Sequence, residues 1–474
     1  MGGHTRLLIP ILLLCGTLGA AEDAATYGRQ ALAFTREKAW PEAEASLRKA
    51  LALAPDNPDA RYLLGVVLLE RRDVAGATAE LRKAVRLRPA YADAHYVLGL
   101  ALGQAGDLAG AAAEFRQAIR SKPAYAVAHM NLGVALRRLG DEKGAAAEFR
   151  EAARLDPKDP ETLYNLGMAL KNENDLEGAI QAFRQAIAVK PDFEKAHYNL
   201  GVTLREQGQQ AAAQKELQEV RALHLFRVRL AESKALILKG VDVLKSGDSA
   251  AALDLFQKAA VQSPTLPTAW FYVGVASSRK GDAPGALAAY RKALELKPDY
   301  APVHSSLGLL YWQQDNHDAA LKEFRQAVMS DPDYPEAHYN LAVALSNLGR
   351  TEEALAELSD AIKLNPDYTE ARIQLGLLLT QKNELTEAAN VYRELIRRQP
   401  DLAEAHNNLG LVLLQSKDLA GAEAAFTQAV RLKPGYAEAH YNLALALREA
   451  GKAARADEEF EKAYRIAPAL RQMR

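Results

Sequence analysis

The sequence is poor in cysteine and has no excess of charge of either sign. Cys15 is the only cysteine among 474 residues, and 59 Lys and Arg stand against 60 Asp and Glu, for a net charge of −1. A single thiol cannot close an intramolecular disulfide or supply the several thiolates of a structural zinc site. Near-neutrality excludes the basic stripe that phosphate recognition requires, so we expect no nucleic-acid partner. The fold must be stabilised by packing.

A hydrophobic run long enough to cross a bilayer is also missing at the N-terminus. Residues 7–14 are apolar but span only eight positions, whereas a membrane-spanning helix needs about 20. The run follows a short, mildly basic start and precedes small residues, with Gly19 and Ala21 at −3 and −1 of a cleavage site after Ala21. This pattern is typical of a secretory signal. We expect an extracytoplasmic, periplasmic protein that begins near Glu22, with no transmembrane span in the mature chain.

Cys15 offers an alternative to cleavage after Ala21, because bacterial lipoproteins carry their lipid on a cysteine that follows the apolar run. Such signals have a small residue directly before the cysteine, and here that residue is the bulky Leu14. Lipid anchoring at Cys15 is therefore the less favoured interpretation.

Proline, in contrast, recurs with a fixed spacing. Within each of two series the step is 34 residues. The series are Pro55, Pro89, Pro123, Pro157 and Pro191, and then Pro264, Pro298, Pro332, Pro366, Pro400, Pro434 and Pro468. A period of this length indicates a repeat architecture.

Other positions align when each repeat is numbered so that this proline is position 32. In one repeat, position 8 is Gly133, position 20 is Ala145 and position 24 is Phe149, and the other repeats hold similar residues there. Positions 20, 24 and 27 form one stripe on a helix. Between two helices stands a pair such as Gly140 and Asp141, because glycine ends a helix in the left-handed conformation and aspartate caps the next one. Each repeat is predicted to be a hairpin of two antiparallel helices, A and B, and the proline ends helix B.

This pattern resembles the tetratricopeptide repeat, and residues 129–157 and 403–434 carry it almost intact. The resemblance covers about residues 24–470. It implies an all-α, right-handed superhelical solenoid of about 13 helical hairpins, whose concave face is lined by the A helices and holds a peptide or a partner protein. One hairpin buries too little surface to fold alone, so neighbouring repeats must cover each other's apolar faces.

One interval breaks the period. Pro191 and Pro264 are 73 residues apart, and the register is lost near Leu225. We expect a signal peptide over residues 1–21, an array of about six repeats over residues 22–225 and an array of about seven over residues 226–474. Residues 215–239 contain no proline or glycine, so helix should continue there, with a bend or a short irregular link at residues 224–230. The break is either a repeat that drifted without function or a hinge or docking point.

Position 6 of helix A points into the groove in tetratricopeptide proteins, and here it carries a series of amides. They are Asn131, Asn165, Asn199, Asn340, Gln374, Asn408 and Asn442. An amide offers a donor and an acceptor, so such a ladder could hold the backbone of an extended peptide. It resembles the asparagine ladder in the superhelix of O-linked N-acetylglucosamine transferases. The alternative is that asparagine is common at this position whatever the ligand.

Tyrosines stand directly before four of these amides, at Tyr164, Tyr198, Tyr339 and Tyr441. They are further candidate peptide-binding residues, because a tyrosine adds both apolar area and a polar tip to a contact surface. Packing between helices explains them equally well.

Seven histidines share position 4 of helix A. They are His95, His129, His197, His304, His338, His406 and His440. Each A helix carries only one, and packed helices lie about 8–10 Å apart, whereas a metal ion needs several nitrogens at about 2.1 Å. We therefore expect these histidines to pack within the hairpin rather than to bind a metal.

No catalytic pattern stands outside the repeat: the chain has no P-loop, no glycine-rich dinucleotide turn and no isolated carboxylate pair. We predict no catalytic residue, no cofactor and no metal, and a non-catalytic scaffold that binds a protein or peptide in the concave groove. Two alternatives remain. The chain could self-associate through the solenoid ends as a structural component, or serve a glycosyltransferase or secretion system whose catalytic part is on another chain.

Overall fold

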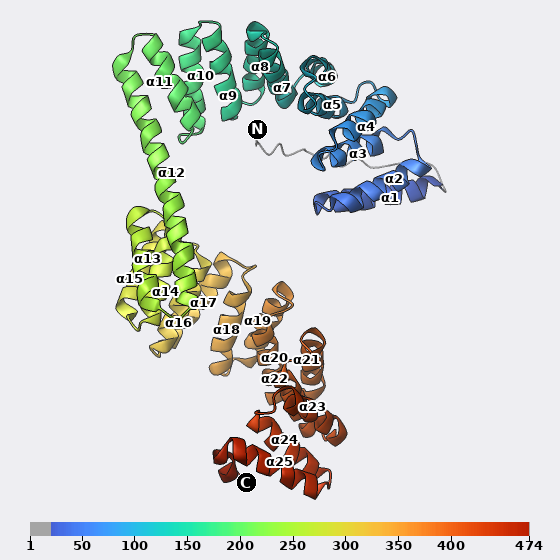
Figure 1. Ribbon diagram of the computed structural model, residues 1–474, viewed down its shortest axis with the longest axis vertical. Helices are drawn as coiled ribbons and strands as arrows, with labels where there is room; N and C mark the ends of the chain where they lie inside the picture. The colour runs from blue at the N-terminus through green and yellow to red at the C-terminus, as the bar shows by residue number, and fades with distance from the viewer. Residues whose placement is uncertain (1–19, 474) are drawn as a thin grey trace. The chain divides into compact units, whose positions relative to one another are not determined.

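The computed structural model describes residues 20–473, and over this range the chain consists of α-helices joined by short turns, with a final 3-10 helix and no strand (Figure 1). Residues 1–19 of the expected signal peptide, Cys15 among them, lie outside the described residues. The contacts divide the chain into two compact units, with the boundary between Arg227 and Val228. The all-helical prediction is confirmed.

Over its described residues, 20–227, the N-terminal unit holds eleven complete helices and the beginning of a twelfth. They are α1 (Ala20–Arg36), α2 (Trp40–Leu53), α3 (Pro58–Glu70), α4 (Val74–Leu87), α5 (Ala92–Gln104), α6 (Leu108–Ser121), α7 (Ala126–Arg138), α8 (Glu142–Leu155), α9 (Pro160–Asn172), α10 (Leu176–Val189), α11 (Glu194–Glu206) and α12 (Gln210–Lys245).

The C-terminal unit holds the rest of α12 and the helices that follow. They are α13 (Ser249–Gln262), α14 (Pro267–Arg279), α15 (Ala283–Leu296), α16 (Ala301–Gln313), α17 (His317–Ser330), α18 (Pro335–Asn347), α19 (Thr351–Leu364), α20 (Thr369–Gln381), α21 (Leu385–Arg398), α22 (Ala403–Gln415), α23 (Leu419–Leu432), α24 (Ala437–Glu449), α25 (Ala453–Ile466) and the 3-10 helix η1 (Pro468–Met473).

Each repeat is a helical hairpin whose ends are fixed by a few residues. Helix α7 has 13 residues and α8 has 14. Between them Gly140 has a φ of 87°, and the Asp141 carboxylate accepts a hydrogen bond of 2.9 Å from the backbone N–H of Gly144. Helix α8 ends at Leu155, and the proline at position 32 follows two residues later. The predicted roles of glycine, aspartate and proline are therefore confirmed.

The core of each hairpin depends on close approach at position 8. Phe149 and Ala145 are fully buried, and a Cβ atom placed on Gly133 would lie only 2.7 Å from the Phe149 ring. The same contact occurs at Gly99 with Phe115 and at Gly167 with Phe183. Glycine at position 8 thus lets helix A lie directly on the ring that helix B provides.

Helix α12 confirms the expectation that helix continues through residues 215–239, but not the irregular link within it. It continues without interruption for 36 residues, so the irregular link expected at residues 224–230 does not form. Leu225 stands where other repeats have the proline at position 32, and without that residue or a glycine the backbone hydrogen bonds of the helix continue. The beginning of α12 serves as the B helix of one hairpin. Its end is the A helix of the next, where a Cβ on Gly240 would lie 2.4 Å from the Phe256 ring.

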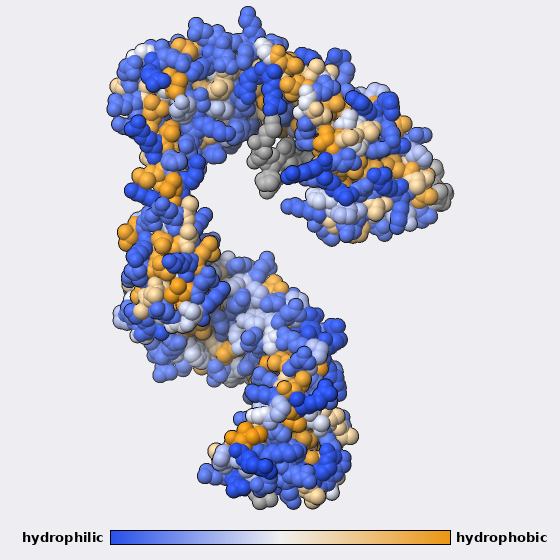
Figure 2. Space-filling view, in the orientation of Figure 1, coloured by the Kyte–Doolittle hydropathy of each residue, from blue (hydrophilic) through white to orange (hydrophobic). Residues whose placement is uncertain are grey.

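Because α12 belongs to two hairpins, the 25 α-helices of residues 20–473 make thirteen hairpins, six in which α12 is the last B helix and seven in which it is the first A helix. The middle of α12 is not covered by other helices. Leu225, Phe226 and Val228 are 47%, 54% and 39% exposed, and apolar residues gather along this helix in the space-filling view (Figure 2).

The C-terminal end is covered by η1. Leu470 packs against the apolar cluster that includes Phe460 and Tyr464, and the guanidinium of Arg471 lies 5.3 Å from the centre of the Tyr464 ring. The last hairpin therefore does not leave its final apolar surface bare.

Candidate functional site

The amides at position 6 lie on the A helices of both units. Asn131, Asn165 and Asn199 are on α7, α9 and α11 of the N-terminal unit. Those of the C-terminal unit are Asn340, Gln374, Asn408 and Asn442, on α18, α20, α22 and α24. All seven side chains are half-buried. In each unit, we call the surface of the A helices that carries these amides the amide face of that unit.

Four of the amides connect one hairpin to the hairpin before it. Each donates from Nδ2 to the side chain at position 5 of the preceding A helix. The contacts are Asn131 to the Tyr96 hydroxyl (3.3 Å), Asn199 to the Tyr164 hydroxyl (3.3 Å), Asn340 to Ser305 (2.9 Å) and Asn442 to Asn407 (3.0 Å). The amide nitrogen therefore has a structural role, which the sequence did not predict.

Asn131 and Asn199 use their NH2 groups fully. Besides the tyrosine hydroxyls, they donate to the backbone carbonyl oxygens of Val127 (2.8 Å) and Lys195 (2.9 Å) in their own helices. Among the hydrogen bonds of the described residues, both N–H groups of each amide are used, so a ligand can bond only to the amide oxygen. These two amides can accept a hydrogen bond but have no further one to donate.

The amides are not equivalent along the face. The oxygen of Asn165 accepts a hydrogen bond of 3.1 Å from the guanidinium of Arg137, and the oxygen of Asn408 accepts one of 3.3 Å from the amide of Asn407. A ligand would have to displace these contacts to reach either oxygen. The N-terminal unit therefore presents Asn131 and Asn199 as the two more accessible acceptors, on either side of Asn165.

Three of the four candidate tyrosines take part in packing. Tyr164 lies 5.3 Å from Phe193, Tyr339 lies 5.1 Å from Tyr368 and Tyr441 lies 5.3 Å from Phe460, measured between ring centres. Burial raises the pKa of the Tyr164 and Tyr339 hydroxyls above the usual value. Tyr198 is the exception, because its side chain is 53% exposed.

The histidines at position 4 make a recurring contact that we call the histidine clasp. In His129, Nδ1 lies 2.6 Å from the Glu148 carboxylate and Nε2 lies 3.1 Å from the backbone oxygen of Pro123. The clasp thus ties helix A to its own helix B and to the end of the preceding repeat. It also occurs at His95, His197, His304, His338 and His440, with Glu114, Glu216, Glu323, Glu357 and Glu459.

Both partners in a clasp are acceptors, so both ring nitrogens must carry a proton for both hydrogen bonds to form. Burial alone would lower the pKa of His95, but the hydrogen bonds to Glu114 and to the Pro89 carbonyl outweigh it and raise the pKa. His304 is raised for the same reasons. The clasp is complete when the histidine is charged.

The glutamate of the clasp was missed in the sequence, although a signal for it was present. This glutamate stands at position 23 of the repeat. In one repeat Arg61 replaces the histidine at position 4 and makes the same two contacts, to Glu80 (2.6 Å) and to the Pro55 carbonyl (2.8 Å). His406 has Ala425 at that position and bonds only to the Pro400 carbonyl. Comparing positions 4 and 23 across the repeats would have shown the pairing.

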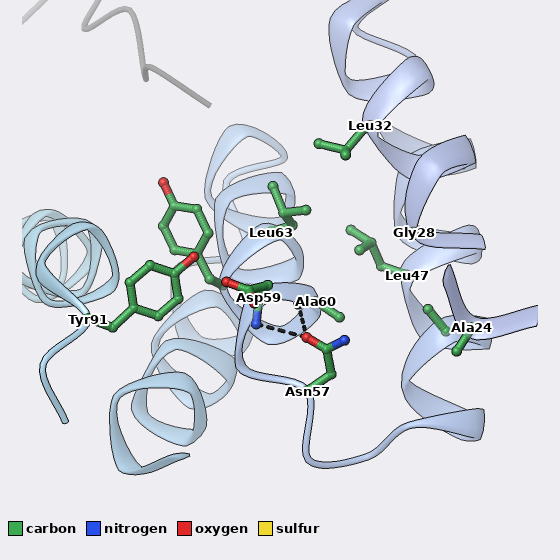
Figure 3. Close-up of a pocket in the computed structure, with 11 residues that line it drawn as sticks. Ala24, Gly28, Leu32, Leu47, Asn57, Asp59, Ala60, Leu63 and Tyr91 are labelled. Carbon is green, nitrogen blue, oxygen red and sulfur yellow. Dashed lines mark hydrogen bonds between the residues drawn. The ribbon is translucent and has the colours of Figure 1, made fainter. Parts of the chain in front are cut away.

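A small hollow lies between the first and second hairpins (Figure 3). Leu32 of α1, Leu47 of α2 and Leu63 of α3 point toward one another around it. Position 5 of this repeat is Gly28, where several other repeats have a tyrosine. Asn57 at its edge caps α3 by accepting hydrogen bonds from two backbone N–H groups. The hollow is lined mostly by apolar groups, and nothing in the sequence predicted it.

Residues 20–473 offer neither a metal site nor a membrane-spanning helix. This range contains no group of three or more His, Cys, Asp or Glu side chains placed to hold a metal ion. No helix in the same range is both long and apolar enough to cross a bilayer. Within it, most of the candidate residues lie on the amide face of one unit or of the other.

Solved structures of repeat proteins are similar to parts or most of the chain. YrrB, described as a TPR protein with an unusual peptide-binding site, is 26% identical over 41% of this chain and 97% of YrrB, with a TM-score of 0.34. MamA from Desulfovibrio magneticus RS-1 is 22% identical over 36% of this chain and 96% of MamA, with a TM-score of 0.34. Yeast Tom70 is 17% identical over 96% of this chain and 100% of Tom70, with a TM-score of 0.38. A search of curated proteins found no match.

Family models of the tetratricopeptide repeat match most of the sequence. One matches residues 96–160, 306–369, 344–403, 373–437 and 418–470. Others match residues 169–208 and 278–315, residues 34–101 and residues 148–181. The matches together run from residue 34 to 208 and from residue 278 to 470. This chain belongs to the tetratricopeptide repeat family.

Proposed function

We propose that the protein is a non-catalytic scaffold that binds an extended peptide, or a segment of a partner protein, along the amide face of a unit. Membership of a repeat family whose fold serves protein–protein interaction supports binding as the activity. The observation that carries the proposal is the position of the Asn131 and Asn199 oxygens, which remain available as acceptors on one face of the N-terminal unit.

The chemistry of the face favours recognition of a peptide backbone. An extended peptide presents backbone N–H groups at regular intervals, and an amide oxygen accepts from any of them whatever the side chain. Asn131 and Asn199 are two repeats apart, so one peptide running across the hairpins could meet both. Such contacts give affinity without strong sequence selection, and side-chain selection must come from neighbouring residues.

The proposed place of action is outside the cytoplasm, in the periplasm. This part of the proposal rests on the signal-like pattern of residues 1–21, with small residues at Gly19 and Ala21. N-terminal sequencing of the protein from fractionated cells tests it. We expect a mature chain that begins at Glu22 in the periplasmic fraction, and an uncleaved chain in the cytosol would contradict the proposal.

Replacing the acceptors tests the binding proposal. We expect Asn131→Ala combined with Asn199→Ala to reduce the recovery of crosslinked partners from native envelope. Because each asparagine also donates to a tyrosine, a loss could reflect looser packing between hairpins instead. Tyr96→Phe with Tyr164→Phe removes the same inter-hairpin hydrogen bonds but keeps the amide oxygens.

The two double variants give distinct outcomes. Binding through the oxygens predicts a loss in the asparagine variant and near-normal recovery in the tyrosine variant. Unchanged recovery in the asparagine variant, or an equal loss in both, would count against the amide face as the site.

A further inference from the structure

Successive hairpins are joined by a recurring pair of rings. The ring at position 5 of helix A lies against the ring at position 34, just before the next helix A. The five pairs, with ring centres 5.1–5.6 Å apart, are Tyr62 with Tyr91, Tyr96 with Tyr125, Tyr164 with Phe193, Phe271 with Tyr300 and Tyr339 with Tyr368. Rings at this separation attract each other beyond the effect of the area they bury.

In two of these repeats the hydroxyl of the position-5 tyrosine also has a hydrogen-bond partner. Tyr96 and Tyr164 each accept a hydrogen bond of 3.3 Å from the asparagine of the next repeat. Tyr62 and Tyr96 are only 2% and 3% exposed. An aromatic side chain at position 5 is thus usually covered on one face by a second ring, and in two repeats its hydroxyl also accepts a hydrogen bond.

Tyr198 on α11 has the same position but neither partner. Position 34 of its repeat is Arg227, whose guanidinium pairs with Glu194. Position 6 of the following repeat is Leu238, which has no hydrogen-bonding group in its side chain. Tyr198 is accordingly 53% exposed, and one face of a ring that is covered in five other repeats is bare.

The bare ring lies in an open hollow at the end of the N-terminal unit. Its walls include Phe193, Asn199 of α11, and Val220 and Arg227 of α12. Charged side chains of both signs stand around it, so net charge would not select a ligand there. Phe193 is already paired with Tyr164, so the hollow lacks the ring that position 34 places against the position-5 ring in five other repeats.

We propose that this hollow binds an aromatic side chain of the partner peptide, with its ring against Tyr198 where the regular repeats have the ring of position 34. The inference rests on the proposed function, because it names one contact of the peptide on the amide face. Asn199 follows Tyr198 directly and lines the same hollow. One region of the peptide can therefore donate a backbone N–H to the Asn199 oxygen and place its ring on Tyr198.

A phage-displayed library of random peptides, selected on the purified protein, tests the inference. We expect the enriched peptides to share an aromatic residue. The best one is then synthesised in two forms, with the aromatic residue and with leucine in its place, and its affinity is measured by fluorescence anisotropy. Stacking and burial of one ring correspond to a loss of about tenfold in affinity for the leucine form.

Variants of the protein locate the contact. Tyr198→Ala should lower the affinity for the aromatic peptide about tenfold and leave little difference between the two peptides, because the lost contacts are the same. Tyr198→Phe keeps the ring and should bind almost normally. Met329→Ala removes another exposed apolar side chain, on α17 of the other unit and 73% exposed, and should have no effect.

Failure of the inference and failure of the proposed function look different. If aromatic peptides bind equally well to the protein and to Tyr198→Ala, the inference is overturned, while the asparagine variants still decide the proposed function. A library that yields no binding peptide contradicts both. Sedimentation that detects a dimer in the protein but not in Tyr198→Ala would show that a second copy fills the hollow, which also overturns the inference.

Discussion

At position 4 of the repeat, one imidazole faces two acceptors, and this arrangement makes stability depend on pH. The pKa of His95 is raised in the folded chain, while in the unfolded chain it is about 6.5. The folded state therefore binds the proton more tightly. The stabilisation is fully present below the unfolded pKa and is lost as the pH rises through the folded pKa.

The substitution His95→Arg should remove this dependence of stability on pH. Arg61 stands at the same place in another repeat, makes the same two contacts and stays charged. We expect the urea midpoint of the protein to fall as the pH rises above about 6.5, and to fall less in His95→Arg. His406→Arg is the control, since His406 has no glutamate opposite it. An identical pH profile in His95→Arg and the unmodified protein would show that the clasp at His95 does not couple to folding.

Position 8 allows an equally specific test of packing. A Cβ on Gly133 would meet the Phe149 ring at 2.7 Å, and overpacking of this kind costs about 1–3 kcal/mol, partly offset by the better helix propensity of alanine. We expect Gly133→Ala to lower the free energy of unfolding by about 1–2 kcal/mol in urea titrations followed by circular dichroism. Gly103→Ala is the matched control within a helix, because its Cβ position lies 3.8 Å from the nearest atom, the Ala111 Cβ; an equal loss there would remove the steric explanation.

These residues also show what the sequence could predict. The spacing of Gly133 and Phe149 within one repeat revealed the hairpin, because contacts inside a hairpin recur at fixed separations. The hydrogen bond from Asn131 to Tyr96 joins two A helices, so it depends on how hairpins stack, and no local pattern encodes it. Glu148, opposite His129, is an intermediate case. Its separation of 19 residues recurs in other repeats and could have indicated the contact.

At the scale of helices, the boundaries followed from proline, glycine and aspartate wherever those residues were present. Helix α12 shows the limit of this approach. Its sequence contains no residue that breaks a helix between residues 215 and 239, and the expectation that helix continues there is confirmed. The irregular link, one of the two alternatives expected at residues 224–230, rested on the repeat period alone. The period describes how hairpins pack, whereas the continuity of a helix depends on its own residues.

Restoring the missing proline should interrupt α12. Leu225→Pro removes one backbone N–H and clashes with the carbonyl of Arg221, which disrupts the helix at a cost of about 3 kcal/mol or more. We expect amides of residues 221–229 to lose protection in hydrogen exchange, while α7 and α22 keep theirs. Leu225→Ala should preserve the protection, because alanine favours helix. Rapid exchange at residues 224–230 in the unmodified protein would instead mean that the helix is already interrupted there.

At the scale of the whole chain, stability should be local to each unit. Each hairpin contacts mainly its neighbours, so a destabilised repeat affects those beside it and little else. We expect Gly133→Ala to speed hydrogen exchange in α5 to α10 and to leave α20 to α25 unchanged. Gly410→Ala, with its Cβ 2.6 Å from the Phe426 ring, should give the reverse pattern. Loss of protection throughout the chain in either variant would mean that the two units unfold as one.

The histidine clasp has a calorimetric consequence. Because the folded chain holds protons on His95 and His304 more tightly than the unfolded chain does, unfolding near neutral pH releases protons to the buffer. The heat measured on melting then includes the heat of protonating that buffer. At the same pH, the apparent enthalpy of unfolding should differ between phosphate and Tris. The slope of this enthalpy against the protonation enthalpy of the buffer gives the number of protons that the chain releases on unfolding.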